Sequence, residues 1–330
     1  MLKYQQAEQK FQELIADLGP GKALPPVREL ISKSGFSQAT VMKAISALEK
    51  RGLLERRRGA GIFTIHSGGR FSDAVAVMLS KIDNGTSSQI LKGIQLALAR
   101  RGNQVQLFSF GEQVNKILPA LKNNGIQQLI LYPNTPDLNN MDFLDFVEQL
   151  GKLEMQIATI EVPVPGLKCV FVGQENTKAF EEVTEYLLRQ GIRSIAVTGM
   201  FNGVIYTSRL AGIRNAIAEK NPSVRLKQID ESGGEDAEMI AKQLLAARCE
   251  AILLCNSESS RDIARELRIH GGSNPDRLRV AGVVEQGDRI PFPNAISLEK
   301  QNIELGAAAV KALFSAKQMT RYLPIKVHYP

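Results

Sequence analysis

The sequence predicts an N-terminal α+β module followed by a larger α/β body built on parallel sheets. Residues 1–66 contain three helical patterns and then two short β segments. The rest of the chain alternates apolar strands with amphipathic helices, and Ser-Gly-Gly-Arg lies between the two parts. At 330 residues the chain is too long for one ordinary core. We therefore expect a first domain at residues 1–66, a linker at 67–72 and a second domain at 73–330.

The positive charge of the chain is concentrated at its N-terminus. The net charge is +7, and residues 1–66 hold eleven Lys and Arg against six Asp and Glu, a balance of +5. The other 264 residues hold 30 against 28. This asymmetry predicts a polyanion-binding module attached to a nearly neutral body.

Composition excludes several classes of protein. A hydrophobic fraction of 44% and a charged fraction of 23% are typical of a soluble globular protein. No apolar run approaches the ~20 residues that span a bilayer, and the N-terminus lacks the apolar stretch of a signal peptide. Three cysteines without a CxxC pair and three scattered histidines predict neither a metal site nor a cofactor. We expect a cytoplasmic protein with no membrane partner.

The first two helices are predicted from apolar spacing and from helix-breaking residues. The second helix begins near Pro25 or Pro26, where proline is tolerated in a first turn, and ends at Gly35. The first helix covers residues 4–18, where apolar side chains recur at helical spacing, namely Ala7, Phe11, Leu14, Ile15 and Leu18.

A third helix and a hairpin complete the first module. Ser37 is a natural N-cap for the third helix, and Gly52 ends it. Two β segments follow at residues 53–57 and 61–66. Three helices and a hairpin in this order form a winged helix-turn-helix. The buried face of the third helix is predicted at Val41, Ala44, Ile45 and Leu48.

This arrangement accounts for the charge at the hairpin tip. The N-terminal residues of such a third helix face base edges in the major groove, and the hairpin meets neighbouring phosphates. Arg56, Arg57 and Arg58 would displace counterions from DNA. Gly59 and Gly61 permit a tight turn and a close approach to the DNA backbone.

The segment "ALPPVRELISKSGFSQATVMKAISALEKRGLLERRRGAGIF" resembles the DNA-binding module of the GntR family of bacterial transcription regulators. The resemblance covers about residues 4–66 and implies that double-stranded DNA is a partner. Met42 and Ala60 depart from the residues common in that family. For each implied helix contact the alternative is an ordinary exposed helix residue. The implied DNA-binding residues are Arg28, Ser37, Gln38, Thr40, Lys43, Arg56, Arg57, Arg58, Gly59 and Gly61.

The body of the chain reads as repeated βα units. "DAVAVML" predicts a buried strand and "SSQILKGIQLALARRG" an amphipathic helix, and further pairs continue to "RVAGVV". Such repeats predict parallel sheets with helices on both faces, and the run is long enough for two sheets.

Residues 73–329 resemble the effector domain of the LacI/GalR family, itself similar to periplasmic sugar-binding proteins. The resemblance implies a periplasmic-binding-protein-like fold of two subdomains that binds an effector in the cleft between them and forms dimers. It rests on ordered segments that include "LKGIQLALARRGNQVQL", "EYLLRQGIRSIAVTG", "SRLAGIRNAI", "AILLCNSESS" and "AISLEKQNIELGAAAVKALF".

Residues that follow the strands are the candidate effector contacts, because ligands of such folds bind at the carboxyl ends of strands. The resemblance singles out Arg209 as a clamp for polar ligand groups, with pairing to a carboxylate as the alternative. Ser257 and Val284 stand where the family usually has aspartates, so a carboxylate that often grips sugar hydroxyls is missing. The resemblance implies a sugar or sugar derivative as the effector, and the missing carboxylate leaves a non-sugar or no ligand at all as the alternatives. The candidates are Asp83, Asn84, Tyr132, Tyr206, Arg209, Asn256 and Glu285.

The implied function is a sequence-specific transcriptional regulator controlled by a small molecule, with repression as the expected direction. A homodimer would present two winged helices to a palindromic site. The alternative is a regulator with a vestigial pocket, whose body serves only as a dimerisation scaffold. An enzyme is disfavoured, because the sequence contains no Gly-x-Ser-x-Gly elbow, Walker loop or HExxH motif.

Overall fold

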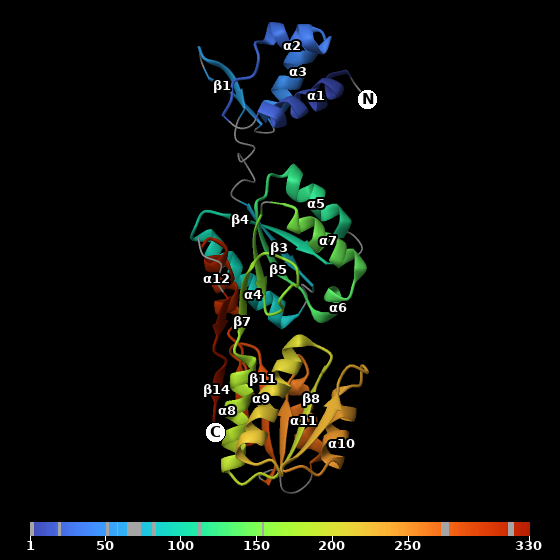
Figure 1. Ribbon diagram of the computed structural model, residues 1–330, viewed down its shortest axis with the longest axis vertical. Helices are drawn as coiled ribbons and strands as arrows, with labels where there is room; N and C mark the ends of the chain where they lie inside the picture. The colour runs from blue at the N-terminus through green and yellow to red at the C-terminus, as the bar shows by residue number, and fades with distance from the viewer. Residues whose placement is uncertain are drawn as a thin grey trace.

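A computed structural model describes most of the chain. The described residues are 3–18, 21–50, 53–57, 59–64, 74–80, 84–110, 114–153, 155–271, 277–315 and 320–330. The expected linker at 67–72 lies outside them, as do Arg58 and Asp83. Figure 1 shows a small unit at one end of the molecule and two α/β lobes that follow it along the long axis.

The small unit is the predicted winged helix-turn-helix. It consists of α1 (Lys3–Leu18), α2 (Val27–Ser34), α3 (Gln38–Lys50) and a hairpin of β1 (Leu54–Arg57) and β2 (Gly61–Thr64). The two strands pair antiparallel. The order of elements is the one expected from the sequence.

Local chemistry explains where these helices begin and end. Gly35 adopts φ 75° after α2, and its N–H donates to the carbonyl of Ile31, as a C-terminal glycine does. The backbone N–H of Thr40 donates to Ser37 Oγ at 3.3 Å, which confirms the predicted cap of α3. The predicted face of α3 is fully buried against α1 and α2, with Val41, Ala44, Ile45 and Leu48 all at 0% exposure.

Two six-stranded sheets form the body of the protein. We call the first of them, with its helices, the N-lobe; its strand order is β13-β7-β6-β5-β3-β4. All its strand pairs among the described residues are parallel. The strands are β3 (Ala74–Leu79), β4 (Gln104–Ser109), β5 (Gln128–Tyr132), β6 (Gln156–Ile160), β7 (Val170–Gln174) and β13 (Thr320–Leu323).

The second sheet and its helices form the C-lobe, with strand order β14-β12-β11-β10-β8-β9. The sheet is parallel except at its edge, where β14 runs antiparallel to β12. The strands are β8 (Ser194–Gly199), β9 (Arg225–Asp230), β10 (Ala251–Leu254), β11 (Arg279–Val284), β12 (Ile296–Glu299) and β14 (Lys326–His328).

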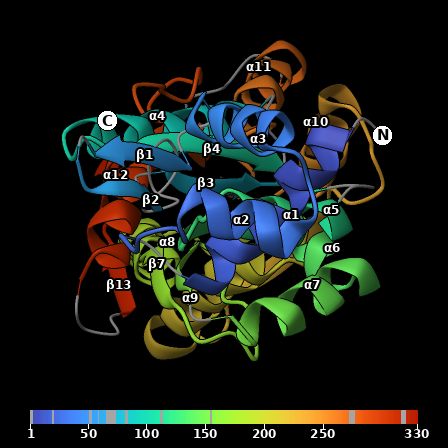
Figure 2. The ribbon, with the colours of Figure 1, turned by 90° about the horizontal axis from the view of Figure 1, so that it is seen from above.

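Helices cover both faces of each sheet. Alternate residues of β3 face opposite layers: Ala74, Ala76 and Met78 pack with α5 and α7, whereas the intervening residues pack with α4 and α12. Figure 2 shows these two helix pairs on opposite sides of the N-lobe. The helices of the N-lobe are α4 (Gly85–Ala99), α5 (Val114–Asn123), α6 (Thr135–Leu138), α7 (Met141–Gly151) and α12 (Asn302–Leu313).

The C-lobe repeats this arrangement. Helices α8 and α9 pack on one face of its sheet, and α10 and α11 pack on the other. The four helices are α8 (Asn176–Arg189), α9 (Val204–Lys220), α10 (Ala237–Ala246) and α11 (Ser260–His270). None of the described helices has both the length and the apolar character needed to cross a bilayer.

The chain passes between the lobes three times. It leaves the N-lobe between β7 and α8, returns between β12 and α12, and leaves again between β13 and β14. Neither lobe is therefore one continuous stretch of sequence, and three short connections join the two lobes.

Two glycines bring α4 and α12 into backbone contact. A Cβ atom added at Gly93 would lie 2.0 Å from the carbonyl oxygen of Ile303, and one added at Gly306 would lie 2.2 Å from that of Ile90. No side chain fits at such distances, so these helices approach closely only because both positions lack a Cβ atom.

We expect Gly93→Ala to lower the free energy of unfolding by about 2 kcal/mol, because the new methyl group forces α4 and α12 apart. Urea denaturation followed by circular dichroism measures the change. Gly151→Ala is the control, since nothing lies within 4 Å of its added Cβ atom. Equal stability of the two variants would contradict this account of the helix contact.

Candidate functional site

The candidate DNA-binding residues of α2 and α3 lie mostly on the surface. Arg28, Ser37, Gln38 and Lys43 are exposed, and Thr40 is partly buried. Ser37 Oγ and Thr40 Oγ1 lie 2.9 Å apart, in addition to the cap that Ser37 provides. Ser37 precedes α3 and the three candidates that follow it in sequence lie in the first turns of this helix, where the N-terminal N–H groups favour an anion.

Lys43 makes a cation–π contact that was not expected from the sequence. Its Nζ lies 4.4 Å from the centre of the Tyr4 ring on α1. A cation over an aromatic face is favourable, so the lysine connects α3 to α1. Tyr4 lies one residue into the first amphipathic helix, and the apolar spacing of that helix does not distinguish it.

The two described arginines of the hairpin, Arg56 and Arg57, do not lie on one face. Successive side chains of a strand point to opposite faces, so Arg56 shares the face of the buried Leu54, and Arg57 lies on the other face. Arg56 Nε donates to Glu49 Oε1 of α3 at 2.6 Å. The guanidinium of Arg57 lies 4.4 Å from the centre of the Phe63 ring.

The glycines of the hairpin tip adopt the backbone expected of them. Gly59 has φ 76° and Gly61 has φ 114°, and the N–H of Ala60 donates to the carbonyl of Arg57 at 2.9 Å. Side chains other than glycine are strained in this region of backbone space. Both positions therefore require glycine for the turn itself, whatever their contacts with DNA.

A cavity of about 650 Å³ lies between the two lobes. Its volume is in the range of small-molecule sites. Tyr132, at the end of β5, contributes to its wall from the N-lobe, and Tyr206 of α9 contributes from the C-lobe. The other described lining residues are apolar or carry amides, hydroxyls and one carboxylate, and include Pro133, Asn134, Asn139, Val162, Met200, Asn202, Ile205 and Glu258.

The structure brings only some of the candidate effector contacts to this cavity. Asn84, Tyr132 and Tyr206 line it. Arg209, Asn256 and Glu285 are not among the described lining residues, and their polar atoms contact other groups of the protein. Their role as effector contacts remains a prediction.

Arg209 is 4% exposed and lies behind Tyr206. Its Nε donates to Asn176 Oδ1 at 2.8 Å, and a second nitrogen donates to the carbonyl of Cys255. Asn256 likewise donates from Nδ2 to Glu231 Oε2 at 3.0 Å. The alternative prediction was that Arg209 pairs with a carboxylate. Its hydrogen-bond partners are instead a side-chain amide and a backbone carbonyl.

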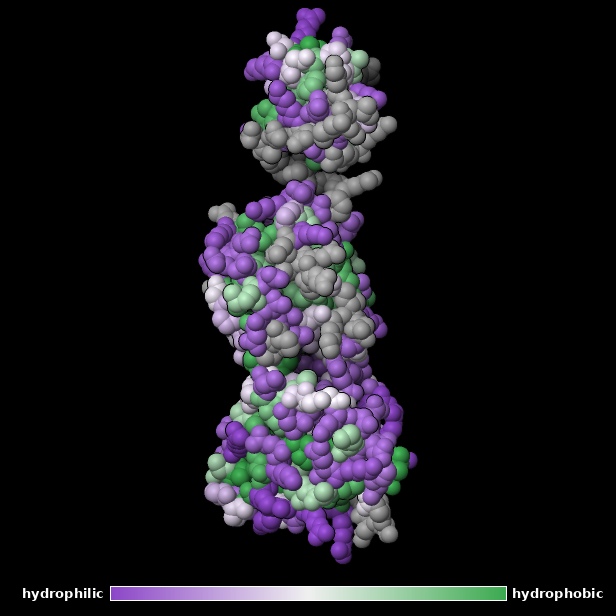
Figure 3. Space-filling view, turned by 90° about the vertical axis from the view of Figure 1, so that its right-hand side faces the viewer, coloured by the Kyte–Doolittle hydropathy of each residue, from purple (hydrophilic) through white to green (hydrophobic). Residues whose placement is uncertain are grey.

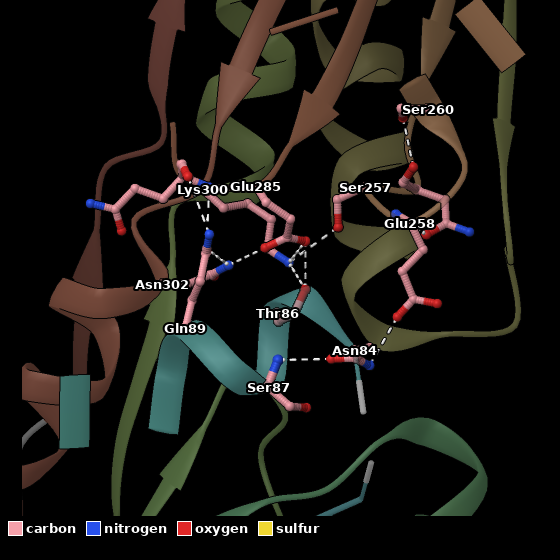
Figure 4. Close-up of polar contacts among 12 residues, drawn as sticks. Asn84, Thr86, Ser87, Gln89, Ser257, Glu258, Ser260, Glu285, Lys300 and Asn302 are labelled. Atoms are coloured by element: carbon pink, nitrogen blue, oxygen red, sulfur yellow. Dashed lines mark hydrogen bonds and ion pairs between the residues drawn. The ribbon is translucent and has the colours of Figure 1, made fainter. Parts of the chain in front are cut away.

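Glu285 belongs to a polar cluster that bridges the lobes (Figure 4). Thr86 of α4 donates from Oγ1 to Glu285 Oε1 at 2.6 Å and accepts from Lys300 Nζ at 2.7 Å. Lys300 Nζ also lies 3.4 Å from Glu285 Oε1 and 3.3 Å from Ser257 Oγ. Asn302, at the start of α12, donates to the second carboxylate oxygen of Glu285. We call these five residues the interlobe cluster.

The charges within the interlobe cluster shift one another's pKa values. Burial by itself raises the pKa of Glu285, but the charge of Lys300 and hydrogen bonds from Thr86, Ser257 and Lys300 bring it below its ordinary value. Burial lowers the pKa of Lys300, which the charge of Glu285 opposes. The cluster therefore stabilises Glu285 as a carboxylate.

The two tyrosines of the cavity remain protonated. Burial is the main cause that raises the pKa of Tyr206 to about 12, and it raises the pKa of Tyr132 further. Each phenol is therefore a hydrogen-bond donor at neutral pH.

Sequence reasoning missed most of the interlobe cluster. Thr86, Lys300 and Asn302 are buried, and all lie close to sequence positions where an apolar strand gives way to a helix. The one feature of the sequence that could have indicated two of these residues is the polar run Glu-Lys-Gln-Asn that follows the apolar "AISL". Among the described residues, no group of three or more His, Cys, Asp or Glu side chains is placed to hold a metal ion.

Two family models match this chain. Residues 3–64 match the model of bacterial regulatory proteins of the gntR family, and residues 184–327 match that of the periplasmic binding protein-like domain. The first match covers the winged-helix unit, and the second covers much of the C-lobe.

Two curated relatives align with nearly the whole chain. The arabinose metabolism transcriptional repressor of Halalkalibacterium halodurans is 22% identical over 89% of this chain and 83% of its own length. The protein of the same name from Geobacillus stearothermophilus is 21% identical over 94% of this chain and 90% of its own length.

Solved structures of LacI type share the fold of the body. A LacI transcriptional regulator from Lactobacillus brevis has a TM-score of 0.65 at 16% identity, over 77% of this chain and all of that one. The Cra dual regulator of Pseudomonas putida with fructose 1-phosphate scores 0.60 at 14% identity, over 78% and 98%. A LacI-type regulator from Alkaliphilus metalliredigens with D-xylulofuranose scores 0.60 at 14% identity, over 78% and 97%.

The fold and these comparisons define the class: the protein is a DNA-binding transcriptional regulator. Within that class it combines a GntR-type helix-turn-helix with a LacI-like, periplasmic-binding-protein-like body.

We expect Glu285→Gln to lower the free energy of unfolding by roughly 3 kcal/mol at pH 7, because Lys300 loses its buried counter-charge. The folded-state pKa of Glu285 lies below the ordinary 4.5. Its contribution is therefore complete above pH 4.5 and is lost as the pH falls through the folded-state value. Urea unfolding of wild type and variant between pH 7 and pH 3.5 should show the difference shrinking below about pH 4.5.

Glu148→Gln is the matched control for this experiment, since Glu148 pairs with Lys152 on the exposed surface of α7. Because an exposed ion pair is screened by solvent, this variant should be as stable as the wild type, within the error of the measurement, at each of these pH values. A Glu285→Gln effect that stays constant with pH would contradict the assignment of the shifted carboxylate.

Proposed function

We propose that this protein is a cytoplasmic homodimeric repressor whose affinity for a palindromic operator changes when a small molecule occupies the cleft between its lobes. The observation that carries the proposal is the cavity of about 650 Å³, which lies between two lobes joined in sequence to a winged helix. The names of the two curated relatives support repression, and they support a sugar as the class of effector.

The proposed DNA surface has two parts. Arg28 of α2 and the first turns of α3, with Ser37, Gln38, Thr40 and Lys43, enter the major groove. The hairpin, with Arg56, Arg57, Arg58, Gly59 and Gly61, contacts the neighbouring backbone. Exposure of the helix residues and the basic balance of residues 1–66 support this surface.

The proposed effector contacts are the polar groups that reach the cavity. Asn84, Tyr132 and Tyr206 contact the effector directly, and Asp83 precedes the first of them in sequence. Three further candidates act indirectly, because each holds in place a segment that forms the wall of the cavity. They are Arg209, Asn256 and Glu285. Ligand binding that moves one lobe relative to the other would alter the placement of the winged helices, with a coupling of typically ~1–3 kcal/mol.

The second candidate is a regulator whose body serves only as a dimerisation scaffold. The observation that favours it is that Arg209 and Glu285 are both engaged within the protein. The two candidates differ in ligand-induced stabilisation. An effector at a hundred times its Kd should add ~2.7 kcal/mol to the free energy of unfolding, whereas a scaffold should show no such gain.

Operator selection tests the regulatory proposal. Full-length protein is incubated with a pool of random duplexes at moderate salt, and the bound DNA is sequenced. We expect enrichment of a palindrome, and sedimentation should show a dimer on it. Absence of any enriched sequence would argue against sequence-specific regulation.

Variants at the selected operator then locate the DNA surface. Arg28→Ala and Lys43→Ala should each weaken operator binding. A lost base contact should cost about 1–3 kcal/mol, and a lost phosphate contact should lower the slope of log K against log salt by about one. Lys242→Ala is the control, because this lysine pairs with Glu238 on the C-lobe, away from the winged helix. A loss for the control equal to that of Lys43→Ala would count against the proposed surface.

A further inference from the structure

We propose that the cleft ligand is an uncharged or cationic polyhydroxyl compound, and that Glu258 excludes its phosphorylated and carboxylate counterparts. The inference rests on the proposed function, since it concerns the effector of the same cavity. The named ligands of the compared regulators include a sugar phosphate and an uncharged sugar, so the likeness of fold does not decide the charge.

The described lining of the cavity offers no cation to an anionic ligand. Among the described residues that form its wall, none is lysine, arginine or histidine, and Glu258 alone carries a charge. A phosphate or carboxylate placed there would lose its hydration without gaining a counter-charge.

Among the described residues near the cavity, two buried cations, Arg209 and Lys300, already contact protein partners. Arg209 donates to Asn176 and to the carbonyl of Cys255. The ammonium group of Lys300 contacts Glu285, Thr86 and Ser257 within the interlobe cluster. Neither cation is among the described residues that line the cavity. Recruiting Arg209 for an anionic ligand would break its contacts within the C-lobe, and recruiting Lys300 would break contacts that join the lobes.

Glu258 is held in place from both lobes. Its backbone N–H donates to Asn256 Oδ1 at 3.2 Å in the C-lobe. Its Oε1 accepts from Asn84 Nδ2 of the N-lobe at 3.0 Å, as Figure 4 shows. Asn84 is itself oriented, because its Oδ1 caps α4 by accepting from the N–H of Ser87 at 2.8 Å. The carboxylate is therefore positioned in the cavity wall by a fixed amide.

The rest of the wall suits hydroxyl groups and the apolar face of a ring. Tyr132 and Tyr206 present protonated phenols from opposite lobes, and Asn134, Asn139 and Asn202 add side-chain amides. Apolar lining from Pro133, Val162, Met200 and Ile205 completes the wall. Such a mixture of neutral donors, acceptors and apolar surface is complementary to a polyol rather than to an anion.

Glu258→Gln separates charge from shape. The amide oxygen of the variant can still accept from Asn84 Nδ2, so the bridge between the lobes is retained while the negative charge is removed. A residue that only bridged the lobes would leave the preference for ligand charge unchanged.

The test compares matched sets of probes with the full-length protein, by thermal unfolding and calorimetry. Each set contains a pentose or hexose, its phosphate, its uronic acid and, for the hexoses, its amino sugar. The uncharged or amino member of at least one set should bind at least about tenfold more tightly than its anions. Glu258→Gln should reduce this preference by roughly tenfold through tighter binding of the anions. Glu219→Gln, which removes an exposed carboxylate on α9 outside the cavity lining, should leave the preference unchanged.

Three results would overturn the inference. They are an anionic probe that binds more tightly than its uncharged counterpart, a preference unchanged in Glu258→Gln, and no response to any uncharged or amino probe. Operator binding is measured on the same preparation. Failure of the inference with operator binding intact leaves the regulator proposal standing, whereas absence of operator selection refutes that proposal itself.

Discussion

The arrangement of the two lobes depends on one buried lysine. Lys300 lies where the chain returns from the C-lobe to the N-lobe, and it is 6% exposed. An ammonium group in such a place is costly unless several groups are fixed around it. Thr86 comes from the N-lobe, whereas Ser257 and Glu285 come from the C-lobe, so satisfying one charge requires that both lobes meet. The contact of the lobes is thus an electrostatic requirement as well as a matter of packing.

A second set of buried polar groups joins the crossings to each other. Gln174, at the end of β7, donates to Glu161 Oε1 at 2.8 Å and accepts from the backbone N–H of Gln301 at 2.9 Å. Asn176 links the same Glu161 to Arg209. A rotation of the lobes must therefore exchange these bonds for others, which favours discrete arrangements over continuous bending. Residues of both lobes line the cavity, so a ligand bound there can favour one arrangement of the lobes over another.

Much of the fold followed from local patterns in the sequence, but the details of the cleft did not. The buried face of α3 and the glycines of the hairpin follow from helical spacing and backbone conformation, which depend on near neighbours. Arg209 and Glu285 were expected to face a ligand, yet their polar atoms contact Asn176 and Lys300. Such pairing joins positions far apart in the chain, and no local period encodes it. Lys300 itself resembles any solvated lysine until its neighbours are known.

The triple crossing of the chain also sets the order in which the protein can assemble as it is made. Residues 3–64 contain every element of the winged helix and leave the ribosome first. The N-lobe sheet follows, but one of its faces awaits Leu305, Ala309 and Leu313 of α12, which are translated after nearly all of the C-lobe. During that interval the apolar side chains of Val75, Val77 and Leu79 lack their final cover. Nascent chains of this regulator should therefore occupy chaperones for longest at a stage when their DNA-binding unit is already complete.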